Sequence, residues 1–451
     1  MSGLSETWLL SAHGTVIGWD AAAGAPRQHA LTAPGTHLVP IGGPVSIQES
    51  GLGHLLRRDV DDLDLTVPFG PWPGARVTRA GDGRSLHLAF GERYLTADPS
   101  TDRVGFDAMT AAANERFLPL SGADLDALRG LLTREWLVGD AGDLVDPGQS
   151  AMQPDFTLRL GPLAVDLRWQ LPLDLSQWPN RIMLLRDGWR IEPVRRYRPL
   201  IYYAAFGGAE IMRQFALSVR SLCTAGGYDG SIAVLTDKTP EEIDSLLPAG
   251  LAGRVAVIRL DARDRIGFMC ARYAITGWPD AWHHQPLLYL DTDILFDMDA
   301  APLLRAAAMS EHIAAPAERG EALRSSTFIG ANLLAADGCT PGFGDGFNSG
   351  TLAIPSLAEH GGTLALIGRI LTNFGTLHGR NALAWADQEV ANYVSYRIAR
   401  FDTTWISRYV RLANVHATPA GRRGLVHFCW VSGEQRAAVM QNYLARLDAM
   451  R

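Results

Sequence analysis

The pattern of apolar and polar positions divides the chain into two regions. In residues 7–120, short apolar runs alternate with turns rich in glycine, proline and aspartate, a pattern that predicts an all-β region. From residue 200 onward, apolar runs alternate with segments of helical periodicity, which predicts a parallel sheet with crossover helices. The chain is therefore expected to combine an all-β domain with an α/β domain.

The all-β region contains one well-formed unit, residues 86–120, in which a strand pair is followed by a distant Phe117. This unit resembles one repeat of a fascin-like β-trefoil, in which such a phenylalanine fills the core. Fainter versions lie at residues 8–31 and 45–77. Three such units would form a β-trefoil; a β-sandwich or an irregular β domain is the alternative.

A helix is expected at residues 121–136, because Ser121 is a good capping residue and the apolar spacing behind it is helical. Residues 139–153 are rich in Gly, Asp, Pro and Ser, a composition typical of a linker. The expected domains are an all-β domain at 1–140 that resembles a β-trefoil, a linker with a small unassigned segment at 141–198, and an α/β domain at 199–451.

In the α/β domain, the pattern predicts strands at 200–205, 232–237, 254–258 and 287–290. Thr239 and Pro240 open a helix with favourable capping chemistry. Another helix is expected around residues 271–275, ahead of the last of these strands.

The buried strand at 287–290 ends at Asp291-Thr292-Asp293. Ligands of open α/β sheets bind outside the carboxyl ends of strands. Two carboxylates there repel each other unless a cation lies between them, and Mg²⁺ or Mn²⁺ prefers oxygen ligands. The alternative is that the two acids only end a strand and begin a loop.

Composition narrows the functional classes. The chain is 47% hydrophobic and 20% charged with a net charge of −7, as expected for a globular protein and unlike a dedicated nucleic-acid binder. Lys238 is the only lysine, which argues against Schiff-base chemistry. The four cysteines form no Cys-x-x-Cys pair, and neither a signal peptide nor a membrane span is visible. We expect a soluble cytoplasmic protein.

Four segments resemble GT-A glycosyltransferases, in particular the retaining family of glycogenin and bacterial lipopolysaccharide galactosyltransferases. They occur in the family's order, at residues 288–296, 347–352, 387–392 and 425–428. The resemblance covers roughly residues 200–440 and implies a Rossmann-like nucleotide-diphospho-sugar transferase fold.

The resemblance also implies roles for individual residues. The implied metal ligands are Asp291, Asp293 and His427, for Mn²⁺ or Mg²⁺. The implied catalytic residues beside the anomeric carbon are Asp387 and Gln388. The implied donor contacts are Tyr203, Ala204, Ala205, Arg272, Asp291, Thr292, Asp293, Asn348 and Ser349.

The implied activity is transfer of a hexose from a nucleotide-diphosphate sugar, with retention of configuration. A UDP-sugar is the family default, and the acceptor would be a glycan, a lipid-linked glycan or a protein. The implied partners include no nucleic acid.

Two departures from the family pattern affect donor binding. The family carries a Lys-Pro-Trp run after its late histidine, whereas this chain has no lysine there and offers Arg436 at a different spacing. The first strand ends in Ala204-Ala205-Phe206, where the family often has an acidic residue that meets the base.

Other interpretations remain open at the sequence level. His416 competes with His427 as a ligand, Asp387 is also a plausible helix cap, and Asp297 and Asp299 form a second acid pair in which Asp299 resembles a cap. A phosphatase of the haloacid dehalogenase type needs a lysine downstream of the acids, but Lys238 lies upstream. The main alternative is a non-catalytic, glycan-binding protein with an inactive glycosyltransferase scaffold.

Overall fold

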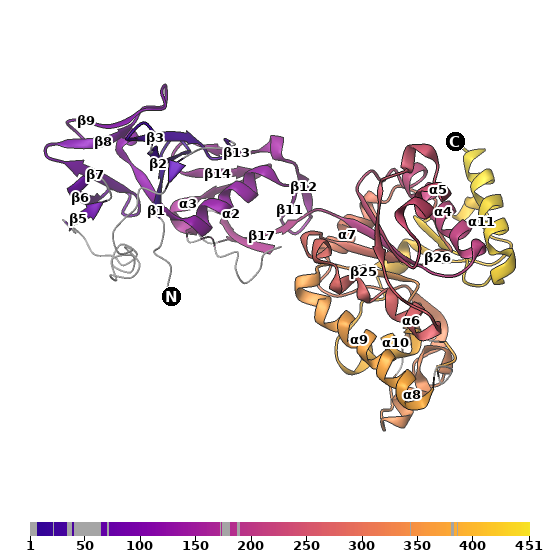
Figure 1. Ribbon diagram of the computed structural model, residues 1–451. Coiled ribbons are helices and arrows are strands. Elements are labelled where there is room, and N and C mark those ends of the chain that lie inside the picture. Colours follow the sequence, from indigo (N-terminus) through magenta and orange to yellow (C-terminus); the bar gives the residue numbers. More distant parts are fainter. Residues whose placement is uncertain are drawn as a thin grey trace. The chain divides into compact units, whose positions relative to one another are not determined.

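The computed structural model describes residues 7–20, 22–33, 38–39, 65–69, 72–171, 173, 181–186, 190–342, 344–379, 383–385 and 387–451. The chain divides into two compact units, Met1–Arg196 and Tyr197–Arg451 (Figure 1).

Unit 1 begins with a sheet of ten described strands. In chain order they are β1 (Thr7–Ser11), β2 (Thr15–Asp20), β3 (Ala25–Ala30), β4 (Leu38–Val39), β5 (Leu65–Phe69), β6 (Trp72–Arg79), β7 (Leu86–Phe90), β8 (Arg93–Ala97), β9 (Val104–Ala108) and β10 (Phe117–Ser121). The main path through the sheet is β3-β2-β1-β10-β7-β6-β5, and every described pairing in it is antiparallel. The all-β expectation for this region agrees with these strands.

The trefoil itself stays a prediction. The unit at 86–120 forms β7, β8 and β10, and Phe117 is fully buried in a cluster with Leu86 and Leu95. The unit at 8–31 forms β1, β2 and β3. Much of the third unit, at 45–77, lies outside the described residues.

The rest of unit 1 packs into a core shared with the first strands and does not form a linker between two domains. Its elements are α2 (Gly122–Thr133), β11 (Trp136–Val138), β12 (Asp143–Val145), β13 (Ser150–Gln153), β14 (Thr157–Leu160), β15 (Leu163–Asp166), α3 (Leu167–Gln170), β16 (Arg181–Arg186) and β17 (Arg190–Arg196), with the short 3₁₀ helices η1 (Ala113–Glu115) and η2 (Pro147–Gln149). Ser121 caps α2 as expected, with Asp124 completing a capping box. The predicted linker at 139–153 was wrong, because it contains β12, η2 and β13, and because Val145 is buried in one core with Leu10 and Leu128.

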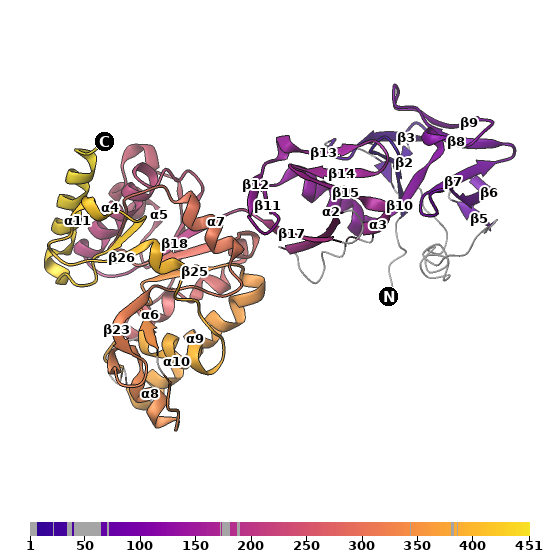
Figure 2. The ribbon, with the colours of Figure 1, turned by 180° about the vertical axis from the view of Figure 1, so that it is seen from behind.

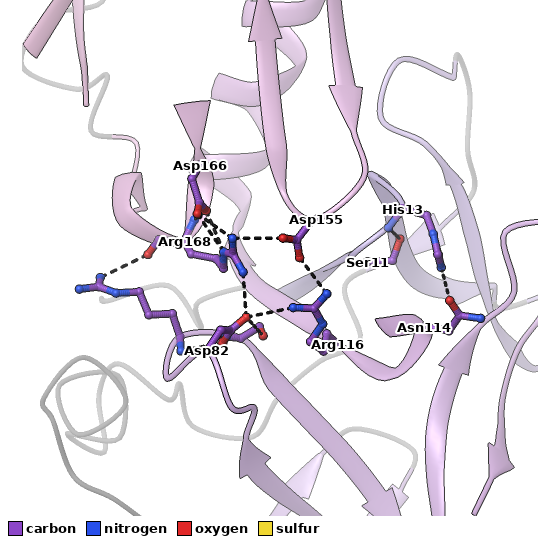
Figure 3. Close-up of polar contacts among 10 residues, drawn as sticks. Ser11, His13, Asp82, Asn114, Arg116, Asp155, Asp166 and Arg168 are labelled. Carbon is purple, nitrogen blue, oxygen red and sulfur yellow. Dashed lines mark hydrogen bonds and ion pairs between the residues drawn. The ribbon is translucent and has the colours of Figure 1, made fainter. Parts of the chain in front are cut away.

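An ion network connects early and late segments of unit 1 (Figure 3). Arg168 pairs with Asp82, Asp155 and Asp166, and Arg116 pairs with Asp82 and Asp155. Because hydrogen bonds from Ser85 and from the Arg168 guanidinium outweigh the opposing effect of burial, the pKa of Asp82 falls well below its ordinary value.

Unit 2 is built on a five-stranded sheet in the order β20-β19-β18-β21-β25. Strands β18 and β25 of this sheet are labelled in Figure 2. These strands are β18 (Leu200–Ala205), β19 (Ser231–Thr236), β20 (Val255–Arg259), β21 (Leu287–Leu290) and β25 (Thr351–Ile354). The first four in this order are parallel, and β25 runs antiparallel to β21. The four strands predicted from apolar runs are confirmed within one residue at each end.

Helices cover both faces of this sheet (Figure 1). The helices of unit 2 are α4 (Ala209–Thr224), α5 (Pro240–Leu246), α6 (Arg265–Ala271), α7 (Ala301–Met309), α8 (Ala331–Ala336), α9 (Leu357–His378), α10 (Asp387–Arg397) and α11 (Gly433–Asp448). One face of β18 packs Tyr203 against Phe215 of α4, while Tyr202 on the other face belongs to the core shared with α9 and α10.

The helix expected around 271–275 lies earlier in the chain. It is α6, which ends at Ala271, and a separate 3₁₀ turn, η4 (Ala274–Gly277), follows. The Asp264 side chain accepts a hydrogen bond from the Gly267 amide and caps the start of α6. The helix therefore begins at Arg265, six residues before the predicted start at residue 271. The helix at Thr239 is confirmed, with a capping box to Glu242.

A second, three-stranded sheet has the order β22-β27-β26, from β22 (Ile294–Phe296), β26 (Val410–Leu412) and β27 (Leu425–His427). The pair β23 (Ala317–Ala322) and β24 (Asp345–Phe347) forms a small ribbon. The remaining 3₁₀ helices are η3 (Ala249–Leu251), η5 (Pro279–His283), η6 (Thr327–Ile329), η7 (Ile406–Arg408) and η8 (Pro419–Gly421). Within the described part of the chain, no helix combines the length and apolar character needed to cross a membrane.

Candidate metal and donor site

The sheet topology brings distant segments to the carboxyl end of β21. Asp291 directly follows β21, and its amide donates to the Gly350 carbonyl at 2.8 Å. Because β25 is antiparallel and Thr351 pairs with Leu290, the preceding residues Asn348 and Ser349 lie beside the acid pair. This is the edge where ligands bind in open α/β sheets.

His427 reaches the same place through the second sheet. Its strand β27 pairs antiparallel with β22, and His427 lies opposite Ile294, the residue after Asp293. Ligand atoms of Asp291, Asp293 and His427 all lie within 4.8 Å of one another. The structure thus brings together the three residues that the sequence predicted as metal ligands.

The donor set fits a hard or borderline divalent cation, since it offers two carboxylates and one imidazole. Oδ1 of Asp291 accepts a hydrogen bond from Tyr289 at 2.5 Å and pairs with Arg272 at 3.0 Å. The other oxygen, Oδ2, lies on the side of Gly350 and His427. The buried Nδ1 of His427 has no hydrogen-bond partner among the described residues, and a bound ion or ligand would satisfy such an atom.

Gly350 leaves the space that this arrangement needs. A Cβ at this position would lie 2.7 Å from Asp291 Oδ2 and closer still to His427 Cε1, well inside van der Waals contact. The absence of a side chain at Gly350 is therefore required for the two ligands to face each other.

Asp293 is buried between His427 and Arg436. His427 Nε2 lies 3.1 Å from its Oδ1, and Arg436 Nη1 lies 2.9 Å from its Oδ2. Burial alone would raise the pKa of Asp293, but the charge and hydrogen bond of His427 lower it below its ordinary value. Burial alone would likewise lower the pKa of His427, but Asp293 raises it. Arg436, which follows the late histidine at an unusual spacing, thus contacts one of the three candidate metal ligands.

Arg272 bridges Asp291 and Asp387, with both N–O distances at 3.0 Å. It also lies over the Tyr289 ring at 4.7 Å and donates to the Ser349 carbonyl. Burial opposes its charge, but the two carboxylates raise the pKa of Arg272 well above its ordinary value. Its buried Nε has no hydrogen-bond partner among the described residues, so the guanidinium is not saturated.

Asp387 and Gln388 open helix α10, and both are buried. The carboxylate of Asp387 accepts from Tyr273 at 3.0 Å and pairs with Arg272. Burial raises its pKa even though the charge of Arg272 opposes this. The amide of Gln388 accepts from the Ser349 backbone at 3.2 Å.

Asn348 has a fixed amide. Its Oδ1 accepts from the Gly350 amide, and its Nδ2 donates to Glu318, both at 3.0 Å. Both polar ends are thus oriented before any ligand arrives, which is the arrangement expected of a binding residue.

The predicted donor contacts on β18 are placed less favourably. The Tyr203 ring is fully buried, and its hydroxyl accepts from Ser218 of α4, so its side chain faces away from this edge. Ala205 is also buried and Ala204 is partly exposed. Any ligand contact by Tyr203 would therefore be through its backbone. Thr292 is buried between the two acids.

The competing candidates lie elsewhere. His416 is exposed, and the metal-ligating group found among the described residues does not include it. Asp299 is exposed and accepts from the Ala301 amide, but the N-cap of α7 is Ala300, so the expected capping role of Asp299 is wrong. Asp297 is buried and bonded to Gly424 and Tyr443.

Three residues near the site were not predicted from the sequence: Glu318, Tyr289 and Tyr273, which donates to Asp387. Glu318 of β23 is 1% exposed and binds Asn348, and burial raises its pKa despite the Asn348 hydrogen bond. No local signal marks it. Tyr289 donates to Asp291, two residues later in the chain. Because residues two apart on a strand point to the same face, this proximity could have been predicted from the sequence.

Comparison with known proteins yields only partial similarities. No protein-family model and no curated protein matches the chain. The solved structures include the apo-form glycosyltransferase GlyE of Streptococcus pneumoniae TIGR4, at 16% identity and a TM-score of 0.34 over 55% of this chain and 63% of that one. They also include the galactosyltransferase LgtC in complex with donor and acceptor sugar analogs, at 14% identity and a TM-score of 0.36 over 54% of this chain and 96% of that one.

A second GlyE structure is 18% identical, with a TM-score of 0.36 over 56% of this chain and 62% of that one. The chain thus spans less than two thirds of the length of GlyE. At these TM-scores, the likeness establishes neither a family nor an activity for this chain.

Proposed function

We propose that unit 2 is a metal-dependent glycosyltransferase that moves a hexose from a nucleotide-diphosphate sugar to an acceptor, with retention of configuration. The observation that carries the proposal is the convergence of Asp291, Asp293 and His427, from segments far apart in the chain, within 4.8 Å at the carboxyl edge of the sheet. The donor nucleotide is proposed as uridine diphosphate, and the acceptor class as a glycan, a lipid-linked glycan or a protein.

Asp291, Asp293 and His427 would hold Mn²⁺ or Mg²⁺. When bound, such an ion supplies positive charge for a departing diphosphate. The other site residues provide binding and orientation, and these contributions follow from their contacts.

Arg272 and Arg436 supply fixed positive charge beside the acids. Arg272 has an unsatisfied buried Nε, and the Arg436 side chain is 23% exposed, so both have donor capacity for phosphate oxygens. Arg436 would take the place of the lysine that the resembling family carries after its late histidine.

Asn348, Asp387 and Gln388 would orient the sugar. Their polar groups are anchored by Glu318, Arg272, Tyr273 and the Ser349 backbone, so they are held in place before the donor binds. Such preorganisation lowers the entropic cost of placing the anomeric carbon.

The proposal is tested with Asp293→Ala in the full chain. Metal-dependent hydrolysis or transfer of a nucleotide sugar should be abolished in this variant, and undiminished turnover would contradict the proposal. Asp299→Ala is the matched control, because Asp299 is an exposed acid on the other side of β22, between that strand and α7. Since Asp293→Ala leaves the buried His427 without its carboxylate partner, at a cost of about 3–5 kcal/mol, Asp293→Asn should be measured beside it.

A further inference from the structure

Strand β22 is flanked by an aspartate on each side, and both aspartates contact the same two elements, β27 with the residues next to it and α11. Asp293, before the strand, contacts His427 of β27 and Arg436 of α11. Asp297, after the strand, contacts the backbone that leads into β27 and a tyrosine of α11. The first acid belongs to the proposed metal site, but no role has yet been given to the second.

Asp297 is completely buried, and its contacts are specific. Its Oδ1 accepts from the amides of Gly424, at 2.9 Å, and Arg423, at 3.3 Å. Its Oδ2 accepts from the Tyr443 hydroxyl at 2.7 Å. A carboxylate without solvent exposure needs such partners, and here both oxygens are satisfied.

On the side of β27, Asp297 fixes the start of a very short strand. The Asp297 amide donates to the Gly424 carbonyl at 3.0 Å, and at the other end the Phe428 amide donates to the Asp293 carbonyl at 3.1 Å. Gly424 has a φ of 134°, which favours glycine at this position. Because side chains alternate along a strand, a shift of one residue would turn His427 away from Asp293.

On the side of α11, the contact is two helical turns from Arg436. Tyr443 lies seven residues after Arg436, so both side chains project from the same face of α11. Arg411 of β26 donates to the Tyr443 hydroxyl at 2.8 Å, and the Tyr443 ring meets Phe428, next to His427, edge-on at 5.6 Å. Burial and the nearby Asp297 raise the pKa of Tyr443, so its hydroxyl stays protonated and donates to the carboxylate.

We propose that Asp297 is a positioning residue that seats β27 and α11 on β22 and thereby holds His427 and Arg436 at Asp293. The inference rests on the proposed metal site, but its structural part is independent of it. Asp297 would thus control divalent-metal affinity without touching the metal.

The first test is the Mn²⁺ affinity of the full chain, measured by titration calorimetry for Asp297→Ala, Asp297→Asn and Asp299→Ala. Asp297→Ala should weaken Mn²⁺ binding by about 10- to 100-fold, the range found for outer partners of metal ligands. Asp297→Asn should weaken Mn²⁺ binding less than Asp297→Ala does, because its amide oxygen still accepts from Gly424 while the Tyr443 hydroxyl loses its carboxylate acceptor. Asp299→Ala should leave the affinity unchanged.

The second test is hydrogen exchange at the Phe428 amide, which needs no metal. Asp297→Ala should lose protection there, while the amides of the central strands β18 and β19 keep theirs. If Asp297→Ala does not fold, Tyr443→Phe carries the test, with a smaller loss of protection and of Mn²⁺ affinity expected.

A folded Asp297→Ala variant with wild-type Mn²⁺ affinity and wild-type protection at Phe428 would overturn the proposal. A lower melting temperature with both readouts unchanged would overturn it as well. If the wild-type chain binds no Mn²⁺, the proposed function fails, and exchange at Phe428 still decides whether Asp297 seats β27.

Discussion

Asp293 is the residue on which the electrostatics of the site converge. Its carboxylate is shared between His427 and Arg436, while Asp291 is paired with Arg272. A divalent cation and a diphosphate together would redistribute these pairs, because the cation binds carboxylates and the phosphates bind guanidinium groups. Each residue can therefore be tested by separating metal binding from nucleotide binding.

The variant Arg436→Ala should separate metal binding from nucleotide binding. Binding of Mn²⁺ alone should be unchanged or tighter, because a cation paired with Asp293 is removed. Binding of a nucleoside diphosphate with Mn²⁺ should weaken by about 10- to 150-fold, since a charge-assisted hydrogen bond contributes about 1.5–3 kcal/mol. Titration calorimetry measures both. Arg213→Ala is the control, an exposed arginine of α4 that contacts α11 through Gln441; equal losses in the two variants would refute the role of Arg436.

Mn²⁺ affinity should rise with pH. Below the pKa of His427, which Asp293 holds above its ordinary value, a proton must leave the imidazole before it can bind a metal. The affinity should increase about tenfold per pH unit and level off above that pKa. Calorimetry across pH 5.5–8.5 measures the slope, and His427→Gln should flatten it. A pH-independent affinity in the wild-type chain would argue against His427 as a ligand.

Without added metal, the pair of His427 and Asp293 contributes to the stability of the fold, and the contribution of His427 falls as pH rises, opposite to the trend in Mn²⁺ affinity. The contribution of His427 to stability is complete below about pH 6.5 and is lost as pH rises through its raised pKa. The contribution of Asp293 is complete above about pH 3.8 and is lost as pH falls through its lowered pKa. Added Mn²⁺ should therefore stabilise the chain most at neutral and alkaline pH.

Gly350→Ala should weaken Mn²⁺ binding by more than about tenfold, because the new Cβ would clash with Asp291 Oδ2 and His427 and force a ligand to move. Calorimetry is the measurement. Gly362→Ala is the matched control, since Gly362 lies in α9 with open space around its Cβ position. Wild-type affinity in Gly350→Ala would show that the two ligands do not need this spacing.

At the scale of elements, the parallel sheet of unit 2 was predictable because its strands are buried on both faces. The strand predicted at residues 200–205 has the same bounds as β18. The capping residues Thr239 and Glu242 identified the start of α5. The segment 139–153 was mistaken for a linker because its strands are very short and its burial comes from distant partners such as Leu10. Glu318 could not be predicted, because only the ribbon of β23 and β24 brings it to Asn348.

Thr239→Ala gives an element-scale prediction. It removes the side chain that accepts the Glu242 amide at the start of α5, and should lower the free energy of unfolding by about 0.5–2 kcal/mol. Chemical denaturation measures this loss. Because α5 contributes no residue to the site, Mn²⁺ affinity should not change; a change of more than about threefold would contradict this separation.

At the scale of the whole molecule, all residues of the candidate site come from unit 2. Residues 197–451 expressed alone should therefore bind Mn²⁺ and the donor with affinities within about threefold of the full chain, since unit 2 has its own core. Calorimetry on the fragment and the full chain provides the comparison. A fragment that is folded but does not bind would show that unit 1 contributes to the site.

The central claim is a metal-dependent site for a nucleotide-diphosphate sugar at Asp291, Asp293 and His427. The most direct measurement is the melting temperature of the full chain with UDP, GDP and their sugars, each with and without Mn²⁺. One of these ligands should raise the melting temperature when Mn²⁺ is present, with about 2.7 kcal/mol of stabilisation at a hundredfold excess over its Kd, and Asp293→Asn should abolish the shift. No Mn²⁺-dependent shift with any of them, or a shift that survives in Asp293→Asn, would contradict the claim.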